Sequence, residues 1–375
     1  MPWKVDSVSE QRRAFVHLVE TQNSPVAEAS RRFRISRKTG YKWLRRYRED
    51  TSARLTDESR RPRASPRRTD QLVEIQVLET RDLYGWGARK IRAYLARRGT
   101  DVPSIRTVHA ILARNGRVRH PENEPRPPQF FERNKPNELW QLDHKGPLEV
   151  GRRVRHPLTI VDDHSRYLFP MKICDDLTFN TVWDHLWNVF GECGLPDGVL
   201  CDNAFGNRRH PATPTTFERD LIRLDIKPIH GRPYHPQTQG KVERLHGTFE
   251  RELYPHIRRD TVEHFEADAE KWRSVYNCVR PHESLDDEPP VTRWRPSCRS
   301  RPRSIPDVEY PTGSVTRSVP RTGTIGYRGY SIAAGQGLAG HLVRVLERDH
   351  EIHVFYSWKC VRRIPVSQLR KGVRL

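Results

Sequence analysis

Apolar residues in the first 118 positions recur with the spacing of amphipathic helices, and short polar stretches separate these segments. In residues 1–50, Ser36 provides a helix cap, and Tyr41, Leu44 and Tyr47 are expected to face inward from the helix that follows it. The pattern predicts a compact domain with helices at Ser9–Thr21, Val26–Phe33 and Arg37–Arg48.

A second helical domain is predicted over residues 69–118, because the same periodicity returns there with new caps and a closing glycine. Its helices are expected at Thr69–Asp82, Gly87–Arg98 and Ser104–Asn115. Residues 51–68 are rich in Arg, Pro and Ser and predict a basic linker, and residues 119–136 predict a Pro-rich linker.

The pattern changes after residue 137 to runs of β-branched and aromatic residues that alternate with helical segments. Strands are predicted at Leu139–His144, Val154–Asp163, Tyr167–Ile173, Gly198–Cys201 and Ile226–Ile229. Helices are predicted at Phe179–Cys193, Thr215–Arg223, Gln237–His256 and Thr261–Tyr276. Adjacent antiparallel strands followed by alternating helices and strands indicate an α/β core with a mixed sheet over residues 137–290.

The pattern of residues 307–375 predicts β-structure with Gly-rich turns. Strands are predicted at Thr322–Tyr327, Tyr330–Ala333, Leu342–Glu347, Ile352–Tyr356 and Lys359–Pro365. Five short strands of this kind suggest a small β-barrel over residues 307–375. The expected fold is therefore multidomain: all-α modules, an α/β core and a C-terminal β-barrel.

The helices of residues 1–50 have the layout of a helix-turn-helix, in which the second helix of the pair enters the DNA major groove. The basic residues of that helix predicted to contact DNA are Arg37, Lys38, Lys42 and Arg45. A solvated basic face is the alternative. The module at 69–118 resembles a second helix-turn-helix, and a structural bundle and DNA binding both remain open for it. Its candidate phosphate contacts are Arg89, Lys90, Arg92, Arg106 and Arg114.

Positive charge is concentrated in the two ends of the chain. Residues 1–130 carry 29 Lys and Arg against 15 Asp and Glu, and residues 301–375 carry 13 against 5. Residues 131–300 carry 25 against 27, although the whole chain has a net charge of +20. A near-neutral core between cationic flanks is expected of an enzyme held by DNA-binding modules, with a nucleic-acid phosphate as substrate.

The six cysteines are scattered, with no Cys-x-x-Cys pair, which argues against a disulfide framework and a Cys-containing zinc finger. Reduced thiols in the cytoplasm are the expectation. No segment reaches transmembrane length, and the polar N-terminus lacks an apolar signal core. We therefore expect the protein to remain, without a membrane, in the compartment that holds DNA.

Three acidic residues stand in settings that suit metal-dependent chemistry. Asp143 lies at the end of a predicted strand, Asp202 directly follows another, and Glu243 lies in the first turns of a predicted helix. Two carboxylates at strand ends and a third on a nearby helix can hold a pair of hard divalent cations. Such a pair clamps the attacking and leaving oxygens of a phosphodiester. Each residue alone would more often be a turn, cap or solvated residue.

The motifs around these residues resemble those of DDE transposases of bacterial insertion sequences, which are similar to retroviral integrases and have a ribonuclease H-like fold. The residues that carry the resemblance are Trp140-Gln-Leu-Asp143-His-Lys, Thr159-Ile-Val-Asp-Asp-His-Ser-Arg-Tyr167, Cys201-Asp202-Asn203 and His235-Pro-Gln-Thr-Gln-Gly-Lys-Val-Glu243-Arg244. The resemblance covers roughly residues 131–290 strongly and extends to the front helical modules, whereas the last 75 residues match only in kind.

The resemblance implies that Asp143, Asp202 and Glu243 form a metal-binding catalytic triad. Mg²⁺ is the expected ion, with Mn²⁺ as a possible substitute, because every ligand is an oxygen. Lys241 and Arg244 are expected to contact the DNA backbone near the scissile phosphate, with a salt-bridged helix face as the alternative.

Several neighbouring residues receive other interpretations. Asp162-Asp163 is expected to be a structural strand-turn pair, although Asp163 could support a ligand. Glu250 shares a helix face with Glu243 but lies about 10 Å further along the helix axis. Only one of the two can therefore reach ligands near Asp143, and Glu243 is nearer the helix start. The sequence departs from the family's pattern in a longer spacing between Asp202 and Glu243, where Arg208–Pro214 is expected to form a loop. It also lacks the His-His-Cys-Cys zinc module of retroviral integrases.

The resemblance implies a transposase that cleaves DNA at element ends and transfers the strands into target DNA. Its partners would be terminal inverted repeats, target DNA and further copies of itself, in the bacterial cytoplasm with the nucleoid. A domesticated, catalytically silent DNA-binding regulator of the same fold is the alternative, and a plain nuclease is a third reading.

Overall fold

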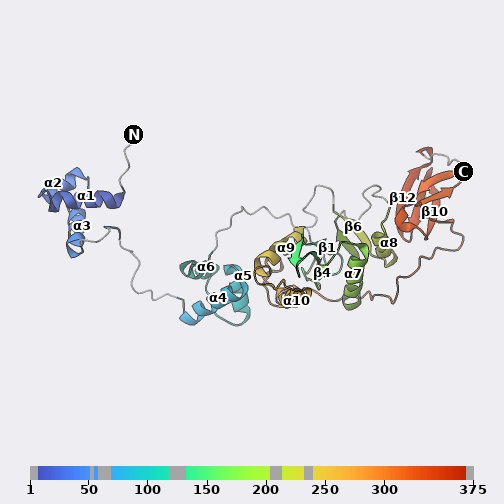
Figure 1. Ribbon diagram of the computed structural model, residues 1–375, viewed down its shortest axis with the longest axis horizontal. Coiled ribbons are helices and arrows are strands. Elements are labelled where there is room, and N and C mark those ends of the chain that lie inside the picture. Colours follow the sequence, from blue (N-terminus) through green and yellow to red (C-terminus); the bar gives the residue numbers. More distant parts are fainter. Residues whose placement is uncertain are drawn as a thin grey trace. The chain divides into compact units, whose positions relative to one another are not determined.

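The computed structural model describes residues 7–50, 55–57, 69–118, 132–202, 213–231 and 240–368 (Figure 1). The chain divides into two compact units, Met1–Arg68 and Thr69–Leu375. The finer domain boundaries expected within the second unit stay predictions. None of the helices in the described part of the chain is both long and apolar enough to cross a membrane.

The first unit is a bundle of the predicted helices, α1 (Val8–Glu20), α2 (Val26–Arg32) and α3 (Arg37–Glu49). The Ser36 side chain accepts a hydrogen bond of 3.1 Å from the backbone N–H of Thr39, which confirms the predicted cap. The buried core of this unit consists of Phe15, Val16, Ala29, Trp43, Leu44 and Leu55.

The inward face of α3 includes Leu44 and Tyr47 as predicted but differs from the prediction at Tyr41. Tyr41 is 60% exposed, whereas Trp43 is 3% exposed. The reason is close packing at Gly40, where an added Cβ would lie 2.8 Å from Cζ of Phe15 and 2.9 Å from Oγ of Ser30. Helix α1 therefore crosses α3 at Gly40, and the face containing Gly40, Trp43 and Leu44 turns inward.

The second unit begins with α4 (Gln71–Tyr84), α5 (Ala88–Arg97) and α6 (Ile105–Arg114), as predicted. Their apolar faces share one core, and Val275 and Val279 from the region of α10 pack against it. Arg89 of α5 forms ion pairs of 2.7 Å with Glu283 and 3.0 Å with Asp287. These contacts join the helical segment to the α/β core.

The α/β core contains a mixed, six-stranded sheet, which confirms the predicted class of fold. Its strands are β1 (Trp140–His144), β2 (Leu148–Val150), β3 (Arg153–Asp162), β4 (Lys172–Cys174), β5 (Gly198–Cys201) and β6 (Lys227–His230). The strand order is β2-β3-β1-β5-β6, with β4 also paired to β3. Strand β1 runs antiparallel to β3 and parallel to β5, and β5 runs parallel to β6.

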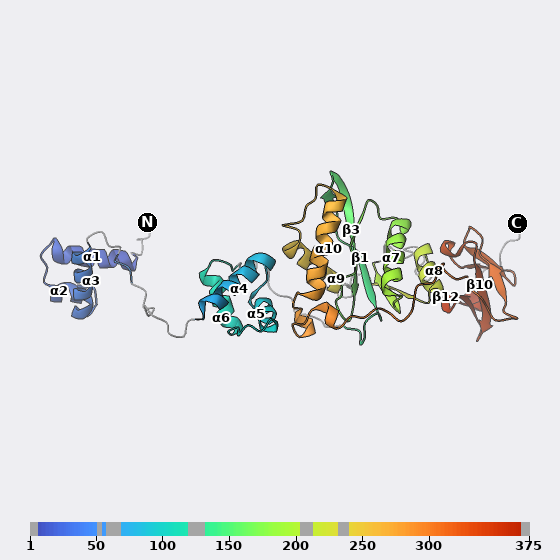
Figure 2. The same ribbon diagram turned by 90° about the horizontal axis from the view of Figure 1, so that it is seen from below.

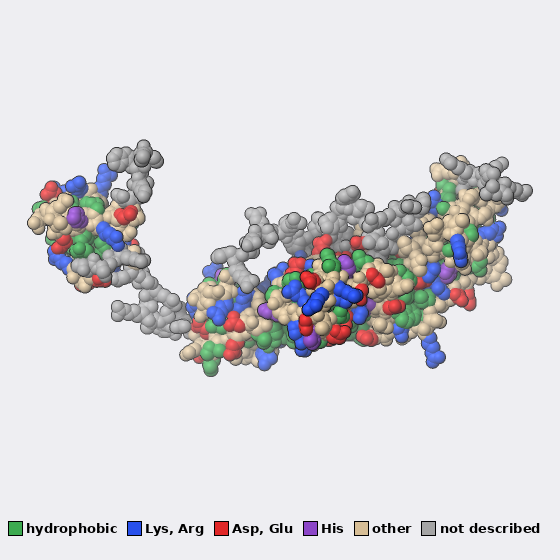
Figure 3. Space-filling view, viewed as in Figure 1, with side chains coloured by type: hydrophobic (Ala, Val, Ile, Leu, Met, Phe, Trp, Pro, Cys, Tyr) green, Lys and Arg blue, Asp and Glu red, His purple; other side chains and the backbone are tan. Residues whose placement is uncertain are grey.

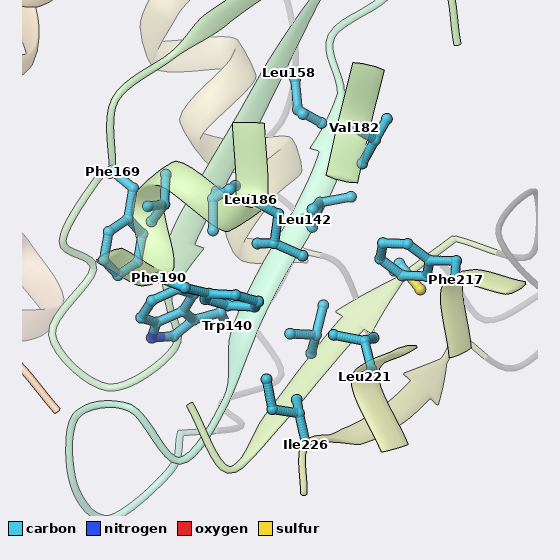
Figure 4. Close-up of a cluster of buried hydrophobic side chains, with 14 of the residues drawn as sticks. Trp140, Leu142, Leu158, Phe169, Val182, Leu186, Phe190, Phe217, Leu221 and Ile226 are labelled. Atoms are coloured by element: carbon cyan, nitrogen blue, oxygen red, sulfur yellow. The ribbon is translucent and has the colours of Figure 1, made fainter. Parts of the chain in front are cut away.

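Helices cover both faces of this sheet (Figure 2). The elements on one side are α7 (Phe179–Cys193) and α8 (Thr216–Arg223). Those on the other side are α9 (Gly240–Glu252) and α10 (Val262–Cys278). Figure 4 shows the first hydrophobic core, in which Trp140 and Leu142 of β1 meet Leu186 and Phe190 of α7 and Leu221 of α8.

Alternation along β1 decides which face receives its polar residues. Because Trp140 and Leu142 pack toward α7, Gln141 and Asp143 project toward the opposite face, where α9 lies. Val161 of β3 lies on that face too, in a second core with Val242 and Phe249 of α9.

The C-terminal segment is all β, and the five predicted strands are present. They are β8 (Thr324–Tyr327), β9 (Tyr330–Ala333), β10 (Leu342–Arg348), β11 (Glu351–Tyr356) and β12 (Lys359–Pro365), preceded by an unpredicted strand, β7 (Thr316–Ser318). The sheet β12-β11-β10-β7 is separate from the hairpin β8-β9, and no strand pairing among the residues described there joins the two. The predicted closed barrel is therefore not confirmed. Short 3-10 helices occur at Glu283–Leu285, Pro290–Thr292, Gln336–Leu338 and Val366–Gln368.

The packing at Gly40 generates a stability prediction. Gly40→Ala gains about 1 kcal/mol of helix propensity, but overpacking against Phe15 and Ser30 is expected to cost more, with a net loss of about 1–2 kcal/mol. Urea unfolding of a fragment comprising residues 1–68, followed by circular dichroism, measures the change. Lys38→Ala, on the exposed side of the same helix, is the control. A Gly40→Ala fragment more stable than the parent would contradict the prediction.

Candidate functional site

Asp143 and Asp202 lie at the carboxyl ends of two neighbouring strands, on the same edge of the sheet. In the parallel pair of β1 and β5, Trp140 lies opposite Val199 and Gln141 opposite Leu200. Extending this register brings Asp143, near the end of β1, level with Asp202, which directly follows β5. The carboxyl ends of neighbouring parallel strands thus bring together two acidic residues that lie far apart in the sequence.

Glu243 lies in the first turn of α9, which contacts β1 and β3. Its Val242, Leu245 and Phe249 pack in the second core, so the helix is held against β1 and β3 while Glu243 is exposed. One turn after Glu243, His246 Nδ1 lies 3.9 Å from Asp143 Oδ2.

The three carboxylates interact electrostatically. Burial, together with the charges of Asp202 and Glu243, raises the pKa of Asp143 to about 6, although the backbone N–H of His144 opposes the shift. Among the described residues, no cluster of three or more His, Cys, Asp or Glu side chains is assembled so as to hold a metal ion. The convergence of all three carboxylates on metal therefore stays a prediction.

The histidines around Asp143 are neutral at physiological pH. Burial lowers the pKa of both His144 and His246 to about 4. The contact between His246 and Asp143 is therefore not an ion pair, and His246 Nε2 instead hydrogen-bonds Thr159 Oγ1 at 2.8 Å. Thr159 lies opposite Asp143 in the β1–β3 pair. His235, at the start of the motif that contains Glu243, lies outside the described residues.

Asp162 and Asp163 are fully buried and make structural contacts, in agreement with the strand-turn interpretation. Asp162 accepts hydrogen bonds from Ser165 and from the backbone of Asn137. Asp163 accepts one of 2.7 Å from Gln141 and forms an ion pair of 2.5 Å with Lys241. Burial and the neighbouring Arg166 lower the pKa of Lys241 to about 8, although Asp163 opposes the shift.

The residues predicted to contact DNA differ in how available they are. Arg244 is exposed, but the Lys241 side chain is only 16% exposed and is engaged by Asp163. The basic residues of α3 are exposed, as predicted, namely Arg37, Lys38, Lys42 and Arg45. Their contact with DNA stays a prediction.

In the second helical segment, part of the basic set is engaged inside the protein. Arg89 is paired with Glu283 and Asp287, and Arg114 with Glu74 at 2.5 Å. These contacts favour the structural interpretation for the two arginines, although Arg89 is exposed, as are Arg92 and Arg106.

Two further contacts near the site were not predicted from the sequence. Lys145 forms an ion pair of 2.6 Å with Glu250, the acidic residue that was the alternative to Glu243 on the same helix. His230, at the end of β6, bridges the backbone carbonyl of Asp202 and the carboxylate of Glu218. A buried Thr-x-x-Glu cap followed by a strand-end histidine is a weak signal that could have drawn attention to this bridge. The loop expected at Arg208–Pro214 falls largely outside the described residues.

Four stretches of the chain match known protein families. Residues 133–236 and 224–290 each match an integrase core domain. Residues 11–63 match a helix-turn-helix domain, and residues 39–112 match a homeodomain-like domain.

On the face seen in Figure 3, acidic and basic side chains of the second unit are interspersed.

Several known proteins are similar to parts of the chain. The Gag-Pro-Pol polyprotein of Mason-Pfizer monkey virus is 33% identical over 111 residues, which is 30% of this chain and 6% of the polyprotein. The transposase for transposon Tn552 of Staphylococcus aureus is 24% identical over 242 residues, which is 57% of this chain and 49% of that transposase. The chain thus spans less than two thirds of either relative.

Among solved structures, a chain of the simian T-cell lymphotropic virus intasome in complex with PP2A regulatory subunit B56 gamma is 18% identical. The match covers 80% of this chain and 99% of that chain with a TM-score of 0.36, a value too low to establish a shared fold. The family matches and the transposase relative confirm the resemblance to DDE transposases: the chain carries an integrase core domain behind helix-turn-helix domains.

Proposed function

We propose that this protein is a transposase that cleaves DNA at the ends of a mobile element and joins those ends to target DNA. The observation that carries the proposal is the setting of Asp143. This residue lies near the end of a central strand of an integrase core, and its carboxylate interacts with those of both Asp202 and Glu243. The motifs around all three residues add support.

Asp143, Asp202 and Glu243 would hold divalent metal ions. All three offer carboxylate oxygens, which Mg²⁺ prefers and Mn²⁺ accepts. The raised pKa of Asp143 supports the fit, because a cation would relieve the repulsion that the other two carboxylates exert on it. Bound ions of this kind activate an attacking water or DNA 3′-hydroxyl and stabilise the departing 3′-oxygen.

The other residues of the site would keep the carboxylates in position. His246, bonded to Thr159, limits the movement of Asp143 on one side. Lys241, ion-paired with Asp163, fixes the first turn of α9 and with it Glu243. No covalent protein–DNA intermediate is needed, since the activated oxygen attacks phosphorus directly.

The flanking domains would bind DNA. The helix-turn-helix unit would read the terminal inverted repeats, and the integrase core would contact the backbone beside the scissile phosphate. The residues proposed for these contacts are Arg37, Lys38, Lys42, Arg45, Lys241 and Arg244. We expect the smallest effect from Lys241, because Asp163 already engages it. A homo-oligomer would join two ends, in the bacterial cytoplasm with the nucleoid.

Removal of one carboxylate should abolish the chemistry. With purified protein, Mg²⁺ and a labelled duplex containing an element end, Glu243→Gln is expected to lower cleavage and strand transfer at least about a thousandfold, because several kcal/mol of transition-state stabilisation are lost. Glu250→Gln, on the same helix but paired with Lys145, should retain most activity. Equal losses in the two variants would refute the assignment of Glu243.

The same assay separates the alternative functions. Binding of the end without any product from the unaltered protein would indicate a catalytically silent regulator. Cleavage at unrelated sequences would indicate a plain nuclease.

The raised pKa of Asp143 predicts a pH-dependent stability. Because the folded-state value of about 6 lies above the ordinary 3.8, ionisation of Asp143 destabilises the metal-free protein progressively between about pH 4 and 6, and fully above that range. Asp143→Asn should therefore raise the free energy of unfolding at pH 8, by at most about 3 kcal/mol, and have little effect near pH 4.

Thermal unfolding without metal at both pH values checks this prediction, with Asp184→Asn, an exposed residue of α7, as the control. Added Mg²⁺ should narrow the difference at pH 8 by stabilising the unaltered protein. A destabilised Asp143→Asn variant at pH 8 would contradict the idea that burial and the neighbouring carboxylates disfavour the ionised form of Asp143.

The DNA-contact residues predict a salt-dependent effect. Lys38→Ala should weaken binding to an end-containing duplex and reduce the slope of log affinity against log salt by about 0.9, the value for one lost phosphate contact. Arg48→Ala removes an equal charge from the same helix, but Arg48 is paired with Glu20 at 2.9 Å and should have a smaller effect. Fluorescence anisotropy at several salt concentrations measures both slopes, and identical slopes would count against Lys38 as a contact.

A further inference from the structure

His230 lies where β6 ends, beside the end of β5. In the parallel pair of these strands His230 is the register partner of Cys201, the residue directly before Asp202. The next backbone N–H, that of Gly231, donates to the carbonyl of Cys201 at 3.4 Å. The sheet therefore brings the His230 ring next to the point at which the chain leaves β5.

The two ring nitrogens of His230 have different acceptors. Nδ1 lies 3.2 Å from the backbone carbonyl oxygen of Asp202, and Nε2 lies 3.0 Å from Oε1 of Glu218. A carbonyl oxygen can only accept, so Nδ1 donates to it. The Sγ of Cys201, at 3.6 Å from Nδ1, is the longer of the two contacts on that side.

Glu218 is itself held in place by α8. Its side chain is 4% exposed, and Oε2 accepts a hydrogen bond of 2.8 Å from the backbone N–H of Thr215. In return, Thr215 Oγ1 accepts from the backbone N–H of Glu218, which completes a capping box. One carboxylate oxygen thus fixes the start of α8, and the other orients His230.

The C-terminal segment holds α8 from another side. Ile222 of α8 belongs to the hydrophobic core of that segment, and Trp358 Nε1 donates to the Ile222 carbonyl at 3.2 Å. Helix α8 is therefore fixed to the C-terminal sheet as well as to the integrase core.

We propose that His230 and Glu218 are positioning residues for the reaction: they fix the backbone at Asp202 so that its carboxylate meets the metal together with Asp143. This inference rests on the proposed function, in which Asp202 is a metal ligand. Neither side chain is expected to touch the metal or the DNA. Partners behind a ligand of this kind typically change metal affinity about 10–100-fold when they are removed.

A purely structural role would have a different signature. Removal of one partner of a buried pair leaves the other unpaired and costs stability, so the response to metal, and not stability alone, identifies a positioning role. Glu218→Gln keeps the shape of the side chain and its cap, and should weaken metal binding with the smaller loss of stability. If the contact only stabilises the packing of β6 against α8, its loss should lower the unfolding temperature without metal and leave the metal concentration at half-effect unchanged. The two roles can therefore be distinguished.

The test uses the full chain and Mn²⁺, with the metal-induced rise in unfolding temperature as the readout. His230→Gln and Glu218→Gln are each expected to raise the Mn²⁺ concentration at half-effect about tenfold, and excess Mn²⁺ should restore the full rise. Gln can still cap α8, which makes Glu218→Gln the variant that guards against misfolding. The double variant should be no worse than either single one, since the two residues act as one unit.

His353→Gln is the matched control, because its Nε2 lies at the same 3.0 Å from a carboxylate, that of Glu351, in the C-terminal sheet. Asp202→Asn should abolish the Mn²⁺ effect. If it does so while His230→Gln and Glu218→Gln match the parent or His353→Gln, the positioning role is overturned and the proposed function stands. If Asp202→Asn leaves the Mn²⁺ effect intact, the assignment of Asp202 as a ligand is overturned, and the inference falls with it.

Discussion

The burial of the Asp143 carboxyl group at one edge of the central sheet, close enough to Asp202 and Glu243 to feel their charges, is the constraint on which the candidate site depends. Burial and the charges of Asp202 and Glu243 disfavour the ionised form of Asp143, a cost that a bound cation would relieve under the proposed function. Side chains on a pliable segment would move apart. Here the parallel pairing of β1 and β5 and the packing of α9 oppose that relaxation.

The hydrophobic cores on the two faces of the sheet supply the rigidity that this arrangement needs. Trp140 and Leu142 pack against α7 on one face, while Val242 and Phe249 hold α9 on the other. Because side chains alternate along a strand, the burial of Trp140 and Leu142 also turns Asp143 toward α9. Packing and electrostatics are thus coupled through a single strand.

Positive charge on this chain has more than one use. Arg89 and Arg114 are paired with carboxylates inside the protein, and Lys241 is engaged by Asp163. The count of 67 Lys and Arg therefore overstates the cationic surface available to a polyanion. The exposed basic face of α3 and the exposed Arg244 are better measures of that surface.

The sequence alone determined the order of most elements, the mixed α/β core and the acidic residues to consider, because hydrophobic periodicity, caps and motifs are local properties. The short strands β2 and β7 were not predicted. Helix α7 and strand β5 have the bounds predicted from periodicity. Periodicity placed Leu44 of α3 inward correctly but not Tyr41, since the contact of Phe15 with Gly40 turns Trp43 inward instead. It could not reveal the bridge from Glu218 through His230 to Asp202, because these residues meet only when β5, β6 and α8 pack. The separation of the two C-terminal sheets, as far as residue 368, was likewise decided in three dimensions, because hydrogen bonding between strands, and not the strands themselves, determines whether a barrel closes.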